Sequence, residues 1–122
     1  MEEAIKAYEG ASDQFEWLLP KFSNDAVTLA RYGGTLYNQA VAHTETRRPD
    51  PDKALQLFHR AVEIQKQSVQ IAPQVKQFST LLQLSLRDYR RLVTKHGANP
   101  QRLKLINQEL ASLQTKEVTR AN

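Results

Sequence analysis

The stretch from Leu29 to Pro73 most constrains the fold, because it has the pattern of two amphipathic helices joined by a polar break. The first half contains LARYGGTLYNQA, the break is TETRRPDPD, and the second half is KALQLFHRAVEIQKQSVQIAP. Apolar residues recur in both halves at steps of three and four, the period of one helical face. No segment of the sequence alternates with the period of two that strands need. The stretch therefore predicts an all-α fold in which helix packs on helix.

Start and stop signals divide the whole chain into five predicted helices. Pro20 disfavours helical geometry at the residue before it, so we expect the first helix to end there. Asp50-Pro51 and Asn99-Pro100 each place an N-cap before a proline at the first helical position. Gly97 suits a left-handed C-terminal cap. The predicted ranges are 2–19, from about 25 to the loop at 44–52, 51–71, 74–96 and 100–115, with a frayed tail at 116–122.

Two adjacent glycines lie inside the second predicted helix, where each costs about 1 kcal/mol relative to alanine. A neighbouring helix that approaches too closely for a side chain would explain Gly33 and Gly34, and a kink is the alternative. We expect close packing, with Gly34 at the crossing and near residues 54–61 of the next helix.

The sequence also repeats itself at an interval of about 50 residues. A shift of 50 or 52 residues superimposes small and aromatic residues of the first two helices on those of the next two. The pairs are Ala4 with Ala54, Tyr8 with Phe58, Ala11 with Ala61, Leu29 with Leu81, Tyr37 with Tyr89, and Ala40 with Leu92.

This pattern resembles the tetratricopeptide repeat, a pair of antiparallel helices with a small residue in the first and Ala-x-x-x-Phe-x-x-Ala in the second. Gly34 with Tyr37 resembles the first signature, and Ala54, Phe58 and Ala61 match the second. The resemblance implies one domain over residues 1–122, about two and a half units stacked as an α-α superhelix, that binds protein or peptide. The unit is longer than the family's usual 34 residues. Such long units are similar to repeats beyond the kinase domain of some large bacterial serine/threonine kinases.

Catalytic and metal-binding patterns are absent from the sequence. There is no cysteine for a thiolate site, and the pair formed by His59 and Glu63 has no further ligand nearby in sequence. Gly33-Gly34 lacks the Gly-Lys-Ser/Thr ending of a phosphate loop. We therefore expect no enzyme activity, no cofactor and no metal. With no apolar run near the roughly 20 residues of a membrane span and no leader-like start, we expect a cytoplasmic protein without membrane contact.

Positive charge is concentrated in the C-terminal third of the chain. Residues 1–86 carry nine Lys/Arg against ten Asp/Glu, whereas residues 87–122 carry eight against three. By the resemblance, the first helix of each unit lines a concave groove, with the polar positions 28, 31, 35, 38 and 39 in one unit and 80, 83, 87, 90 and 91 in the next. Arginine binds carboxylates through paired hydrogen bonds, which favours an acidic peptide as the partner. The predicted binding residues are Arg31, Thr35, Asn38, Arg87, Arg90 and Arg91.

Other readings of the same pattern remain open. The arginines could simply solvate an exposed face, or the basic third could bind nucleic acid, against which stands the near absence of interleaved aromatic residues. The chain could also be a structural spacer or a dimerisation segment of a larger protein, or form a homo-oligomer through its terminal helices.

Overall fold

The computed structural model describes residues 2–97 and 99–121, with the side chains of Phe22 and of residues 115–121 left out. Five helices account for nearly all of this part of the chain. They are α1 (Glu2–Phe22), α2 (Ala26–Glu45), α3 (Pro51–Ile71), α4 (Lys76–Lys95) and α5 (Pro100–Ala121). No strand occurs within the described ranges, so the all-α prediction is confirmed.

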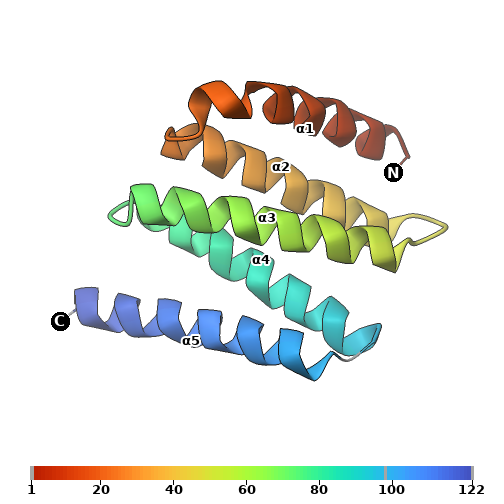
Figure 1. The fold of residues 1–122 in the computed structure, drawn as a ribbon. Coiled ribbons are helices and arrows are strands. Elements are labelled where there is room, and N and C mark those ends of the chain that lie inside the picture. Colours follow the sequence, from red (N-terminus) through yellow and green to blue (C-terminus); the bar gives the residue numbers. More distant parts are fainter. Residues whose placement is uncertain (1, 98, 122) are drawn as a thin grey trace.

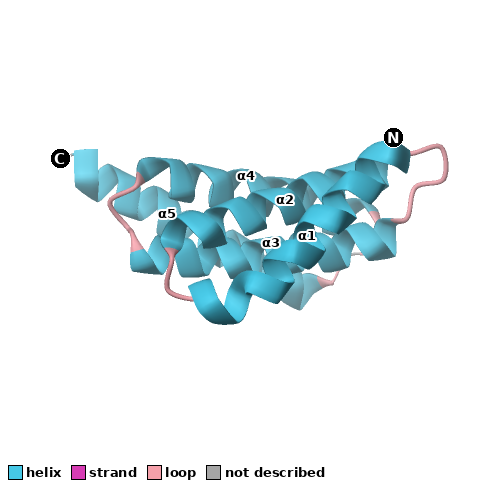
Figure 2. Ribbon diagram, turned by 90° about the horizontal axis from the view of Figure 1, so that it is seen from above, coloured by secondary structure: helices cyan, strands magenta, loops and turns pink. Residues whose placement is uncertain are grey.

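Each helix packs antiparallel against the next one along the chain, and α2 also touches α4 (Figure 1). Viewed from above, the helices form two layers, with α1, α3 and α5 on one side and α2 and α4 on the other (Figure 2). This arrangement leaves α1 and α5 at opposite ends of the stack. The helices α2 and α4 therefore run parallel to each other as neighbours in one layer.

The helix ends follow the predicted caps with two exceptions. The Asp25 carboxylate accepts hydrogen bonds from the backbone N–H groups of Val27 and Thr28, at 3.0 and 3.3 Å. Asp50 caps α3 from the residue before Pro51, and Gly97 has a φ of 121°. The prediction that Pro20 ends α1 is wrong, because that helix continues to Phe22. A proline so near the C-terminal end removes a single intrahelical hydrogen bond. The fifth helix is also longer than predicted, since α5 extends to Ala121.

The core lies between α2, α3 and α4, and α5 closes one side of it. Its centre is a row of aromatic rings in which Phe58 of α3 packs between Tyr37 of α2 and Tyr89 of α4. The ring centroids are 5.9 and 6.3 Å apart. Each helix of the layer formed by α2 and α4 is thereby attached to the same residue of α3, which fixes their register.

Burial repeats between α2 and α4, but with a register one residue longer than the predicted one. A shift of 53 residues superimposes seven buried residues of α2 on seven buried residues of α4. The pairs are Leu29 with Leu82, Ala30 with Gln83, Tyr32 with Ser85, Gly33 with Leu86, Leu36 with Tyr89, Gln39 with Leu92, and Ala40 with Val93. The predicted shift of 52 fails because it pairs the fully buried Leu29 with Leu81, which is exposed.

The two adjacent glycines of α2 have different surroundings. A Cβ built on Gly33 would lie 2.5 Å from Cγ of Gln65 and 3.5 Å from the backbone oxygen of Ala61, both on α3. A Cβ built on Gly34 would meet no atom within 4 Å. The expected close crossing therefore exists at Gly33, and the prediction that Gly34 occupies it is wrong. Successive helical residues point about 100° apart, so adjacent positions face different neighbours.

Alanine substitutions at these two positions should have opposite effects on stability. Gly34→Ala should raise the free energy of unfolding by up to about 1 kcal/mol, because the helix propensity improves and no neighbour is displaced. Gly33→Ala should lower it or leave it unchanged, because the methyl group must displace the buried Gln65. Urea unfolding followed by circular dichroism measures both changes. Equal stabilisation by the two variants would contradict the close approach at Gly33.

Gln65 is only 1% exposed, and its amide nitrogen and oxygen have no hydrogen-bond partner among the described residues. A buried amide without partners costs free energy that an apolar side chain of similar length would not. Gln65→Met should therefore raise the free energy of unfolding by about 1 kcal/mol. The exposed Gln67 on the same helix offers the matched control, and Gln67→Met should change it little. Destabilisation by Gln65→Met in the same urea experiment would refute this expectation.

Candidate binding face

The exposed side of α2 and α4 carries two rows of residues with the same spacing, i, i+4, i+7 and i+11. We call these two rows the open face. All of its residues are exposed except Gly34, which is half-buried. The α2 row consists of Val27, Arg31, Gly34 and Asn38, and the α4 row of Thr80, Leu84, Arg87 and Arg91.

Both rows lie on the same side of the molecule. The layer formed by α1, α3 and α5 covers the opposite side of α2 and α4, so the exposed rows must point away from it (Figure 2). The Tyr37 hydroxyl of α2 donates a hydrogen bond to Oδ2 of Asp88 on α4. This bond aligns the two helices along their length, because it joins residues near the middle of each helix. Along the helix axes, Arg31 therefore lies about one turn nearer the N-terminal ends of α2 and α4 than Arg87 does.

Four of the six predicted binding residues belong to the open face. These are Arg31, Asn38, Arg87 and Arg91. Thr35 is half-buried, and its hydroxyl donates a 3.0 Å hydrogen bond to the backbone oxygen of Arg31.

Arg90 is exposed but points elsewhere. One of its guanidinium nitrogens donates a 3.0 Å hydrogen bond to Oδ1 of Asn107 on α5. It follows Arg87 by three residues and precedes Arg91 by one, which turns it toward the α5 side of the helix. We therefore leave Arg90 out of the open face.

Two further groove positions expected from the resemblance are buried. Gln39 accepts a 3.1 Å hydrogen bond from the Ser12 hydroxyl, which lies on α1. Gln83 is buried in α4. The one-residue error in the repeat register explains both misplacements, since the structural register pairs Gln39 with the buried Leu92.

The open face keeps most of its positive charge unpaired. Neither Arg31 nor Arg87 forms an ion pair with any residue that the structure describes. Arg91 lies 3.8 Å from Oδ1 of Asp88, but its side chain is 83% exposed and the contact is long. Surface ion pairs of this kind contribute little to stability. The guanidinium groups of Arg31, Arg87 and Arg91 therefore remain available to an anionic partner.

Apolar residues interrupt the arginines of the open face, a feature that the sequence analysis did not single out. Val27 is 50% exposed and Leu84 is 43% exposed. Gly34, within the α2 row, leaves open space where a side chain would stand. The open face therefore offers both charge and apolar surface. The helical spacing alone could have indicated Val27, since it precedes Arg31 by one turn.

A pocket of about 390 Å³ opens between α2 and α4 at their C-terminal ends. Its wall combines the aromatic ring of Tyr37 with the cations of Arg91 and Lys95 and the carboxylate of Asp88. Glu45 also lines this pocket, so its wall carries two carboxylates and two cations.

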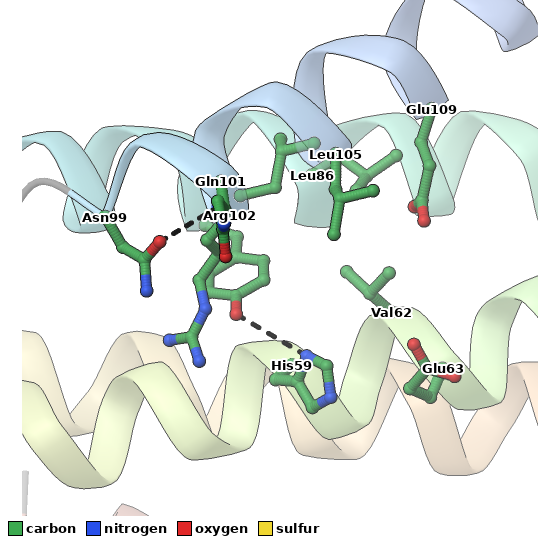
Figure 3. A pocket seen from close by; sticks show the side chains of 11 residues that line it. His59, Val62, Glu63, Leu86, Asn99, Gln101, Arg102, Leu105 and Glu109 are labelled. Carbon is green, nitrogen blue, oxygen red and sulfur yellow. Dashed lines mark hydrogen bonds between the residues drawn. The ribbon is translucent and has the colours of Figure 1, made fainter.

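A second pocket, of about 310 Å³, lies in the opposite layer between α3 and α5, with α4 as its floor (Figure 3). The Tyr89 hydroxyl lies 3.5 Å from Nδ1 of His59, and the Arg102 guanidinium lies over the Tyr89 ring at 6.0 Å. Leu86 and Leu105 supply apolar surface to it. The Glu63 and Glu109 carboxylates lie at the other end of the pocket from Asn99 and Arg102 (Figure 3).

Ion pairs bridge the helices of this opposite layer. Glu16 of α1 lies 3.6 Å from Arg60 of α3, and Lys66 of α3 lies 2.9 Å from Glu109 of α5. The Glu109 hydrogen bond raises the pKa of Lys66, although partial burial opposes the shift. Glu16 and Glu109 on this side of the stack are thus paired, whereas Arg31 and Arg87 of the open face form no ion pair within the described residues.

The described residues contain neither a metal-ligand cluster nor a helix that could span a membrane. Among them, no three His, Asp or Glu side chains lie close enough together to hold a metal ion. None of the helices, over its described length, has the run of apolar residues needed to cross a membrane.

Comparison of the chain with protein-family models, with curated proteins and with solved structures found no match.

Two buried tyrosines, Tyr32 and Tyr89, and the half-buried Tyr37 should make the protein lose stability at alkaline pH. Burial raises the pKa of Tyr32, Tyr37 and Tyr89, and hydrogen bonds to Glu16 and Asp88 raise it further for the first two. A raised pKa means that the folded state holds the phenolic proton more tightly than the unfolded chain, whose tyrosines titrate near pH 10. The stabilisation is complete below about pH 10 and is lost as the pH rises above it.

Urea midpoints measured between about pH 9 and pH 11 would test this, because tyrosine titrates in that window. We expect the midpoint to fall, and to fall less for Tyr37→Phe than for the wild type. A midpoint that stays constant over this range would exclude the proposed linkage.

Proposed function

We propose that this chain is a tetratricopeptide-repeat-like binding module that takes an acidic segment of a partner protein on its open face. The proposal has no catalytic step and requires no cofactor. It is supported by the two-layer stack of antiparallel helices and by the repeated burial pattern of α2 and α4. The single observation that carries it is that two arginines of the open face, Arg31 and Arg87, form no ion pair within the described residues.

Arg31 and Arg87 come from different helices, face the same side and form no ion pair within the described part of the chain. The two rows contain no carboxylate. Like charges on one surface repel, and a bound carboxylate would relieve that repulsion through charge-assisted hydrogen bonds. Val27 and Leu84 beside them favour a segment that interleaves acidic and apolar residues. Such a partner gains affinity from burial as well as from charge.

A fluorescent peptide that alternates Glu and Leu provides a direct test by fluorescence anisotropy. We expect weak binding that falls as salt rises from about 50 to 500 mM, because screening shortens the reach of exposed charges. The variant Arg31→Glu/Arg87→Glu should lose binding at least tenfold (about 1.4 kcal/mol). Both side chains are exposed, so its circular dichroism spectrum should stay unchanged.

The matched control is Lys53→Glu/Lys104→Glu, which changes the net charge equally at exposed positions of α3 and α5. It should bind the peptide almost as well as the wild type. Equal loss in both variants would reduce the effect to overall charge and refute the open face as the site. Tighter binding of a single-stranded oligonucleotide, with a steeper salt dependence, would instead favour the nucleic-acid alternative.

A further inference from the structure

A gap runs between α3 and α5, which lie beside each other in the layer opposite the open face. No Cα atom of α3 comes within 8 Å of a Cα atom of α5 among the described residues. The equivalent gap between α1 and α3 holds Tyr32, whose ring stacks on Phe15 and lies under the guanidinium of Arg60. The shift of 53 residues pairs Tyr32 with the small Ser85 of α4. The gap between α3 and α5 therefore lacks that ring, and the pocket of about 310 Å³ lies in it (Figure 3).

The polar groups of this pocket are sorted along its length. The helices α3 and α5 run parallel, because each is antiparallel to α4 (Figure 1). On α3, His59 precedes Glu63 by about one turn, and on α5, Arg102 precedes Glu109 by about two turns. Since the two helices share a direction, the nitrogen-bearing side chains meet at one end of the pocket and the carboxylates at the other.

The carboxylate end keeps a net negative charge. Nζ of Lys66 lies 2.9 Å from Glu109 and 3.8 Å from Glu63, so two carboxylates share one ammonium group. The Tyr89 hydroxyl lies within the field of both ends. Burial raises its pKa, Arg102 lowers that pKa, and Glu109 and Glu63 raise it further.

The opposite end is rich in hydrogen-bond donors, and the wall between the two ends is apolar. Oδ1 of Asn99 accepts a 3.1 Å hydrogen bond from the backbone N–H of Arg102, so its amide nitrogen is the atom that can donate to a ligand. The Arg102 guanidinium forms no ion pair within the described residues. Val62 and Leu86 are buried in the wall, whereas Leu105 is 60% exposed and would gain from being covered.

The distance between the two ends limits the length of a ligand that could use both. A rise of 1.5 Å per residue separates the opposite groups by about 6 Å along α3 and about 10 Å along α5. An extended peptide spans at most about 3.5 Å per residue, so two or three residues cover this distance. A single amino acid is too short, because its ammonium and carboxylate groups are attached to the same carbon.

We infer that this pocket binds a short peptide of two or three residues that has both termini free and carries an apolar side chain. The terminal carboxylate lies against Arg102 and Asn99, and the terminal ammonium lies against Glu63 and Glu109. The apolar side chain covers Leu105. The site is separate from the open face and does not depend on the function proposed for it.

The tripeptide Ala-Leu-Ala, titrated into ¹⁵N-labelled protein, provides the test by NMR. We expect amide shifts that cluster in residues 59–63 and 99–109, with a dissociation constant on the order of 1 mM. N-acetyl-Ala-Leu-Ala lacks the ammonium group, and Ala-Leu-Ala amide lacks the carboxylate. Each should bind about tenfold more weakly, because the charge-assisted hydrogen bonds at one end are lost.

Variants at the two ends show which charge each end recognises. Arg102→Gln should bind Ala-Leu-Ala and its amide with similar affinity, and Glu63→Gln should narrow the difference between the free and the acetylated peptide. Lys104→Gln and Glu9→Gln are the matched controls, since they remove charges at exposed positions outside the pocket. Both controls should keep the preferences of the wild type, and all four variants should keep its circular dichroism spectrum.

Equal affinity of the wild type for the three peptides would overturn the inference, because neither end would then recognise a charge. Shifts confined to the surroundings of Arg31 and Arg87 would also overturn it, since the open face would then hold the peptide. The absence of any shift at about 10 mM peptide would exclude the site. The variant Arg31→Glu/Arg87→Glu separates the two proposals: it should lose the Glu-Leu peptide and still bind Ala-Leu-Ala.

Discussion

The close approach of α2 to α3 at Gly33 is the constraint on which the rest of the fold depends. A Cβ at this residue would lie 2.5 Å from Cγ of the buried Gln65, so the two helices pack closely here. This contact forms the central helix pair, and α1 and α4 add to either side of it. Phe58 then contacts Tyr37 and Tyr89 from the same side of α3. The register of α2 against α4 thus follows from where α3 can approach α2.

That register decides which residues reach the surface. Because α2 and α4 are covered on one side by α3, each must expose the opposite side, and the spacing of 53 residues brings equivalent positions to it. Arg31, Arg87 and Arg91 become neighbours on one face although up to 60 residues separate them in sequence. The carboxylates of Glu16 and Glu109 are held in ion pairs in the other layer. The packing therefore brings the arginines of the open face together, while it pairs Glu16 and Glu109 with cations of their own layer.

The sequence predicted the elements well because local signals define them, whereas the details of packing depend on contacts that the sequence does not specify. Asp25 and Asp50 cap helices through short-range hydrogen bonds, which a residue pattern can indicate. The choice between Gly33 and Gly34 requires the direction of α3, and one helical position changes that direction by about 100°. The same one-residue error placed Gln39 and Gln83 on the groove, although both are buried. Hydrophobic periodicity identifies the side of a helix that is buried, but not which neighbouring helix covers that side.

The two ends of the stack are not equivalent, and this difference bears on how the molecule meets its partners. A stack of helices exposes the outer side of its first and last members, which must be polar for the molecule to remain dispersed. The outer positions of α5 include the exposed and polar Gln101, Lys104 and Gln108, while the same helix exposes 60% of Leu105. The outer side of α1 exposes a larger apolar side chain, because Trp17 is 71% exposed among the charged residues Lys6, Asp13 and Lys21. The exposed ring carries a cost in water, and a contact that removed it from water would recover that cost.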